Sequence, residues 1–177
     1  MAAERGVREK DEVEEHDEKR LDAETQARRR VALAQIRQYP DAVLRMRARS
    51  VEHFDDDLAR LADRMAHLMH DARGVGLAAT QVGVLQRLFV FQAADADDVT
   101  AIVNPELTGR TEETEVAEEG CLSLQGVLVP IERATGVTIE GQDLRGECPR
   151  LQQGPQRGFW FVAAKHCLHR LLVIVHA

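Results

Sequence analysis

The strongest constraint on the fold is an amphipathic segment at residues 56–73. Its apolar residues recur at three- and four-residue steps, which places them on one face of an α-helix. They are Leu58, Leu61, Met65, Leu68 and Ala72. Asp55 or Asp56 can cap the start of this helix, and Gly74 can end it in the left-handed conformation. The sequence therefore predicts one well-defined helix whose apolar face packs on a core.

Short strands are expected after this helix. Four apolar runs, at 88–91, 101–103, 127–129 and 137–139, have the length and composition of strands. The second run is expected to end at Asn104-Pro105, because proline donates no hydrogen bond to a strand ladder. One helix with several short strands predicts an α+β fold, with small mixed or antiparallel sheets packed around the helix.

Composition excludes several classes of protein. The 177 residues suit one domain, and the net charge of −7 argues against general binding to nucleic acid or to an anionic membrane. No apolar segment is long enough to span a bilayer, and the N-terminus lacks the apolar stretch of a secretory signal. The three cysteines lack the spacing of a disulfide framework. These features predict a cytoplasmic protein.

The chain divides into three parts by composition. Residues 1–30 are mostly charged and predict a flexible extension, and residues 31–147 form the expected domain. Residues 148–177 contain no Asp or Glu, whereas about five would be expected from the average density. We interpret this break after Glu147 as an altered C-terminus, through a coding frameshift or a divergent replacement. The alternative is a naturally basic terminal element.

A glycine-rich segment at residues 74–83 reads Gly-Val-Gly-Leu-Ala-Ala-Thr-Gln-Val-Gly. Its glycines and small side chains allow the backbone to pass close to another group. It lacks the Lys-Ser/Thr pair of a phosphate-binding loop. Gln81 is the polar side chain of interest; alternatively, it is a glutamine in an ordinary turn.

A second motif at residues 118–123 reads Glu-Glu-Gly-Cys-Leu-Ser. Cys121 follows Gly120 in a mostly polar stretch, so that backbone can approach it closely. A thiolate there is a good ligand for Fe²⁺ or Zn²⁺. The alternative is a buried cysteine that acts as a small apolar residue.

The two motifs, in this order, resemble the first two signature segments of the peptide deformylases. Residues 37–44 also match the Arg-x-x-Pro-Asp-x-x-Leu opening of that family, and the resemblance extends over residues 36–147. The family usually has proline at the positions of Thr80 and Gln125. The resemblance implies a deformylase-like fold and a hydrolase that removes the formyl group from N-formylmethionyl peptides of nascent proteins, at the ribosome.

The resemblance also implies roles for four residues. The side-chain amide of Gln81 and the backbone N–H of Leu122 would hold the oxyanion that forms from the formyl group. Cys121 would be a ligand of one Fe²⁺ or Zn²⁺ ion. Gly76 would shape the strand-like edge on which the peptide substrate lies.

The third signature of the family, His-Glu-x-x-His, is not intact in this sequence. The corresponding window contains His166, but Cys167 follows it where the family has Glu, and Arg170 occupies the position of the second His. One reading is an irregular metal site made of Cys121, His166 and His169. The other is a non-catalytic relative, either a peptide-binding protein or a damaged, frameshifted product.

Overall fold

The computed structural model describes residues 23–93, 96–147 and 150–153, which form an α+β fold as predicted. The helices are α2 (Ala23–Gln35) and α3 (Asp56–Asp71), with the short 3-10 helices η1 (Ala42–Arg45) and η2 (Ala79–Val82). The strands are β1 (Gly76–Ala78), β2 (Leu88–Gln92), β3 (Val99–Arg110), β4 (Thr114–Cys121), β5 (Leu124–Ala134), β6 (Val137–Gln142) and β7 (Arg150–Gln153).

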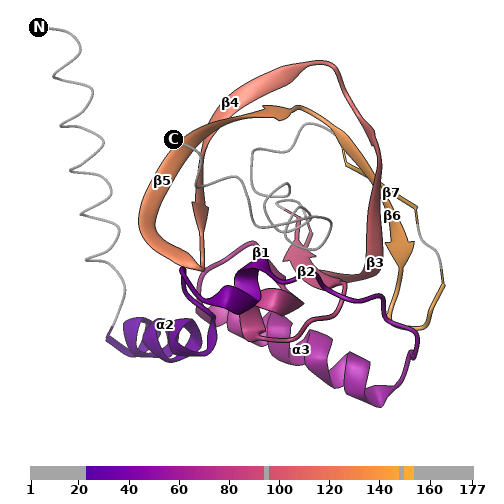
Figure 1. The fold of residues 1–177 in the computed structure, drawn as a ribbon. Coiled ribbons are helices and arrows are strands. Elements are labelled where there is room, and N and C mark those ends of the chain that lie inside the picture. Colours follow the sequence, from indigo (N-terminus) through magenta and orange to yellow (C-terminus); the bar gives the residue numbers. More distant parts are fainter. Residues whose placement is uncertain (1–22, 94–95, 148–149, 154–177) are drawn as a thin grey trace, which may run out of the picture.

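The strands form two antiparallel sheets. The larger one has the order β1-β2-β3-β6-β7, and β4 pairs with β5 alone. Figure 1 shows the β4–β5 hairpin arching away from α2 and α3. Because β4 ends at Cys121 and β1 leads directly into Gln81, each of the two sheets presents one of the sequence motifs.

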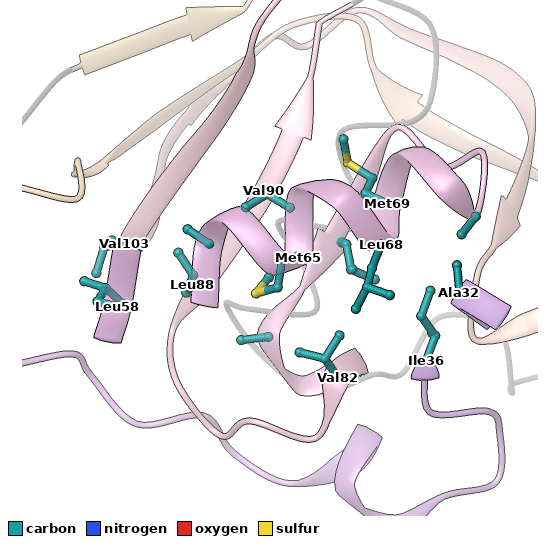
Figure 2. Close-up of a cluster of buried hydrophobic side chains, with 14 of the residues drawn as sticks. Ala32, Ile36, Leu58, Met65, Leu68, Met69, Val82, Leu88, Val90 and Val103 are labelled. Carbon is teal, nitrogen blue, oxygen red and sulfur yellow. The ribbon is translucent and has the colours of Figure 1, made fainter. Parts of the chain in front are cut away.

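Helix α3 forms where its apolar spacing predicts it. The Asp55 carboxylate caps it by accepting a hydrogen bond from the Leu58 N–H at 3.0 Å. Leu58, Met65, Leu68 and Met69 of this helix are buried (Figure 2). Ala62 is buried as well. Strands β1 and β2 pack against this apolar face of α3.

The end of α3 corrects the expectation for Gly74. Arg73, not Gly74, adopts the left-handed conformation, with φ 59°. Gly74 meets a different requirement, because a Cβ atom there would lie 2.6 Å from Cδ1 of Leu122. This glycine therefore makes room for the second motif instead of ending the helix.

Strand β2 lies at the centre of the core. Leu88 and Val90 belong to the cluster that packs on α3 (Figure 2), whereas Phe89 and Phe91 belong to a second cluster. The two Phe rings stack with their centroids 5.4 Å apart. Burial of alternate residues in both clusters explains why this strand reads as a continuous apolar run.

Strand β3 was expected to end at Asn104-Pro105 and instead continues to Arg110. Asn104 has a φ of 49°, and the pairing with β6 shifts register between Val103 and Glu106. The Asn104 side chain accepts from the Val51 N–H at 2.8 Å and donates to the Val51 carbonyl at 2.9 Å. This bulge accommodates the proline inside the strand.

Helix α2 begins at Ala23, inside the segment 1–30 that was expected to be a charged extension. Its Ala32 and Leu33 are buried in the core next to α3. Residues 1–22 and residues 148–177, apart from 150–153, lie outside the described residues. Within the described part of the chain, none of the helices has the length and apolar character needed to cross a membrane.

Candidate functional site

The two sequence motifs meet at one place in the fold. Gln81 lies on η2 and Cys121 at the end of β4, and the Nε2 atom of Gln81 is 3.8 Å from the Cys121 sulfur. Gln81 is 4% exposed, and Cys121 is half-buried. The structure thus brings together the two side chains to which the sequence assigned chemistry.

The orientation of the Gln81 amide is set by its partners. Its Oε1 accepts from the backbone N–H of Ala78 at 2.9 Å, and its Nε2 donates to the Ser123 hydroxyl at 3.0 Å. A backbone N–H only donates, so the amide oxygen must face Ala78. The NH₂ group is therefore directed toward Ser123 and Cys121.

Burial raises the pKa of the Cys121 thiol. Hydrogen bonds from the Ser123 backbone N–H, the Ser123 hydroxyl and the Leu124 backbone act in the opposite direction and offset only part of the effect. The Ser123 N–H lies 3.4 Å from the sulfur. The Cys121 thiol therefore holds its proton more strongly than an exposed cysteine does.

Leu122 and Gly76 occupy the flanks of this site. The Leu122 side chain packs against the core beside Gly74, and its carbonyl accepts from Gln38 Nε2 at 3.0 Å. Gly76 pairs with Phe91, and its strand β1 lies at one end of the five-stranded sheet. The glycine therefore sits on an edge strand adjacent to the Gln81 loop.

A connecting segment, residues 36–39, ties the two loops together. The Arg37 N–H donates to the Gln81 carbonyl at 2.7 Å, and the Tyr39 N–H donates to the Ser123 carbonyl at 2.8 Å. Sequence analysis gave this segment no part in the site. These two contacts span 44 and 84 positions in the sequence, so no local pattern could have shown them.

A buried ion pair supports the strand that carries Cys121. The Arg133 guanidinium donates to both carboxylate oxygens of Glu119, at 2.9 and 3.0 Å. The two side chains are 9% and 2% exposed. The neighbouring Glu118 is exposed. The Glu119 carboxylate is engaged in this bidentate pair, so its role is to brace the β4–β5 hairpin.

The chemistry of the donor set limits the metal site. Cys121 supplies one soft donor that suits Fe²⁺ or Zn²⁺. Among the residues that the structure describes, no three His, Cys, Asp or Glu side chains are grouped to hold a metal ion. His67 and His70 are exposed on α3. His166 and His169 lie outside the described residues. The described part therefore fits one ligand of a metal centre and not a complete one.

Comparison with known proteins identifies the lineage. The sequence model of the polypeptide deformylase family matches residues 33–153, more than two thirds of the chain. This chain belongs to the peptide deformylase family. The peptide deformylase of Thermotoga sp. (strain RQ2) is 46% identical over 112 residues, covering 63% of this chain and 67% of that protein. That of Alkalilimnicola ehrlichii is 39% identical over 143 residues, covering 80% and 78%.

Solved structures of peptide deformylases share the fold. The crystal structure of the Thermotoga maritima enzyme matches with a TM-score of 0.69 at 39% identity, over 75% of this chain and 89% of that one. The Legionella pneumophila structure matches with a TM-score of 0.70 at 36% identity, over 75% and 79%. Peptide deformylases are metal-dependent hydrolases that act on formylated nascent peptides in N-terminal protein processing.

Thr80, next to Gln81, carries a buried hydroxyl that has no hydrogen-bond partner among the described residues. Thr80→Val keeps the shape and removes the unsatisfied group, so we expect the free energy of unfolding to rise by about 1 kcal/mol. Urea unfolding measures it. The control is Thr111→Val, because the Thr111 hydroxyl bonds to Thr135 and accepts from the Gly136 N–H. A lower free energy of unfolding in Thr80→Val than in wild-type chain would contradict the prediction.

Proposed function

We propose that this chain is a deformylase-type hydrolase that removes the formyl group from N-formylmethionyl peptides. The observation that supports the proposal is the position of the Gln81 amide, 3.8 Å from the Cys121 sulfur and directed toward it. A hydrogen-bond donor beside a metal ligand is the arrangement needed to stabilise negative charge that develops on a carbonyl oxygen.

Each residue of the site has a role in this proposal. The Nε2 of Gln81 and the backbone N–H of Leu122 donate to the formyl oxygen as its charge grows in the transition state. The Ala78 N–H holds the Gln81 oxygen away from the substrate, so that no reorientation is required. Gly76 leaves room beside β1, where an extended peptide can add to the edge of the sheet.

Cys121 would hold one Fe²⁺ or Zn²⁺ ion together with ligands from outside the described residues. His166 and His169 are the candidates, because residues three apart share one face of a helix. When bound, the ion would lower the pKa of a water molecule and polarise the formyl group. The chain has Cys167, not Glu, after His166, so a proton-transferring group common in such sites is missing at that position.

The lack of Glu after His166 favours a second candidate. In this case the chain is either a non-catalytic relative that binds formylated peptides or a frameshifted product. The two candidates differ in turnover. A chain whose reading frame is restored after Glu147 should release formate if the tail alone is at fault. Sequencing the encoding DNA decides the origin: a frameshift requires an alternative frame that encodes an acidic His-Glu-x-x-His segment.

Cys121→Ala tests the metal role directly. We expect wild-type chain to bind one Fe²⁺ or Zn²⁺ ion and to release formate from a formyl-Met peptide, and the variant to lose both, because the sulfur ligand is gone. Metal content by elemental analysis and formate by a coupled assay measure this. Cys148→Ala, to which the proposal gives no role, serves as control. A variant that keeps full metal content would overturn the assignment of Cys121.

The proposed substrate also implies a place of action. N-formylmethionyl chains emerge from the ribosome, so we place the protein in the cytoplasm near translating ribosomes. The net charge of −7 argues against binding to nucleic acid or to an anionic membrane.

A further inference from the structure

A line of three hydrogen bonds leads from the surface to the Cys121 sulfur. Gln125 Nε2 donates to Gln38 Oε1 at 3.0 Å, and Gln38 Nε2 donates to the Leu122 carbonyl at 3.0 Å. That carbonyl belongs to the same peptide group as the Ser123 N–H, which donates to the Cys121 sulfur at 3.4 Å. We call these three linked amides the amide relay.

The direction of the amide relay is fixed by its partners. Gln38 Nε2 also donates to the Ile36 carbonyl at 3.1 Å, and carbonyl oxygens only accept. The Gln38 oxygen must therefore face Gln125. Gln125 donates at the start of the line, and Gln38 and the Leu122–Ser123 peptide each accept at the oxygen and donate from the N–H. The dipoles of the three amides therefore point the same way and strengthen one another.

We propose that Gln38 is a positioning residue that holds the Ser123 N–H on the Cys121 sulfur through the Leu122–Ser123 peptide group. Gln125 anchors Gln38 from the exposed side of the loop. The relevance of the amide relay to a metal ligand rests on the proposed function, but its geometry does not.

The contacts around the Leu122–Ser123 peptide group explain why its orientation depends on Gln38. The Ser123 carbonyl is already held by the Tyr39 N–H, and the Leu122 side chain is packed beside Gly74. These contacts fix the loop at both ends. Between them, the Leu122 carbonyl accepts from Gln38 Nε2, and this bond sets the orientation of the Leu122–Ser123 peptide.

The test is amide hydrogen exchange of the full chain, followed by NMR without added metal. In Gln38→Met, which keeps the side-chain length and removes donor and acceptor, we expect the Ser123 amide to exchange about 5-fold faster. Gln125→Met should give a smaller increase of about 2-fold, because Gln125 is exposed. The Met65 amide in α3 should keep its wild-type rate in both variants.

Gln92→Met is the matched control. Gln92 Nε2 also donates to two backbone carbonyls, those of Ala96 and Asp97, at 3.0 and 3.1 Å. Unchanged Ser123 exchange in Gln38→Met, or an equal increase in Gln92→Met, would overturn the proposal. If Gln38→Met does not fold, the comparison of Gln125→Met with Gln92→Met decides in the same way.

Co²⁺ alone, used as a metal probe, separates this inference from the proposed function. Wild-type chain should show a sulfur-to-cobalt charge-transfer absorption, and Gln38→Met should need about 5-fold more Co²⁺ to reach it. Absence of the absorption in wild-type chain would contradict the metal role of Cys121. The hydrogen-exchange experiment would still test the role of Gln38 in the amide relay, because that experiment is done without metal.

Discussion

Glu119→Ala is expected to lower the free energy of unfolding by about 3–5 kcal/mol, because it breaks a buried ion pair by removing one partner. Both hydrogen bonds from the Arg133 guanidinium to the carboxylate are lost, at a site where the two side chains are only 9% and 2% exposed. The Arg133 charge would then be buried without its partner. Urea unfolding of wild type and variant measures the difference.

The neighbouring Glu118→Ala is the control, since Glu118 is exposed and should change stability by less than about 0.5 kcal/mol. A double variant, Glu119→Met with Arg133→Met, should recover most of the loss, because two apolar side chains of similar length need no charge partner. Equal effects of Glu118→Ala and Glu119→Ala would show that the pair contributes no more than a surface contact.

Gln81→Glu is expected to reduce formate release from a formyl-Met peptide by about 10²–10³-fold. The new carboxylate can still accept from the Ala78 N–H, as the amide oxygen does at 2.9 Å, but it cannot donate to the formyl oxygen. The transition state therefore loses one of its two proposed donors. Initial rates at saturating peptide, on chain loaded with Fe²⁺, measure the effect.

Gln35→Glu, on the exposed surface of α2, controls for the added charge. Thermal unfolding should show that both variants remain folded. A Gln81→Glu variant that keeps its rate within about 3-fold would remove Gln81 from the proposed mechanism, because loss of an oxyanion donor costs far more than that.

Local sequence patterns were enough to predict the parts of the fold that depend on neighbouring residues. Helix α3 and its Asp55 cap follow from apolar spacing and from one side chain at the helix start. Strand β2 follows from a short run of bulky apolar residues. Both patterns are complete within a few residues, so tertiary contacts reinforced them and did not override them.

Tertiary contacts decided the features that were missed. Arg73 adopts the left-handed conformation at the end of α3, and Gly74 instead provides the space that Leu122 requires. Strand β4 was not expected, because three of its eight residues are Glu and it contains no continuous apolar run. It forms by pairing along its length with β5. Asn104 lets β3 continue only because its side chain reaches Val51, 53 positions away.

The candidate site shows the same division. Gln81 and Cys121 could be selected from motifs, and the structure places them together. The residues that hold these two side chains in place could not be selected from motifs. Ser123 contacts Gln81 across 42 positions, and Gln38 contacts Leu122 across 84. Such partners have no shared local pattern, although Ser123 lies inside the second motif.

The connecting segment at residues 36–39 also constrains when the candidate site can form during synthesis. It emerges from the ribosome first, yet its partners around Ser123 are translated more than eighty residues later. A contact between distant parts of the chain can form only after both segments have been translated. A growing copy of this protein therefore has no assembled site until its second motif has left the exit tunnel.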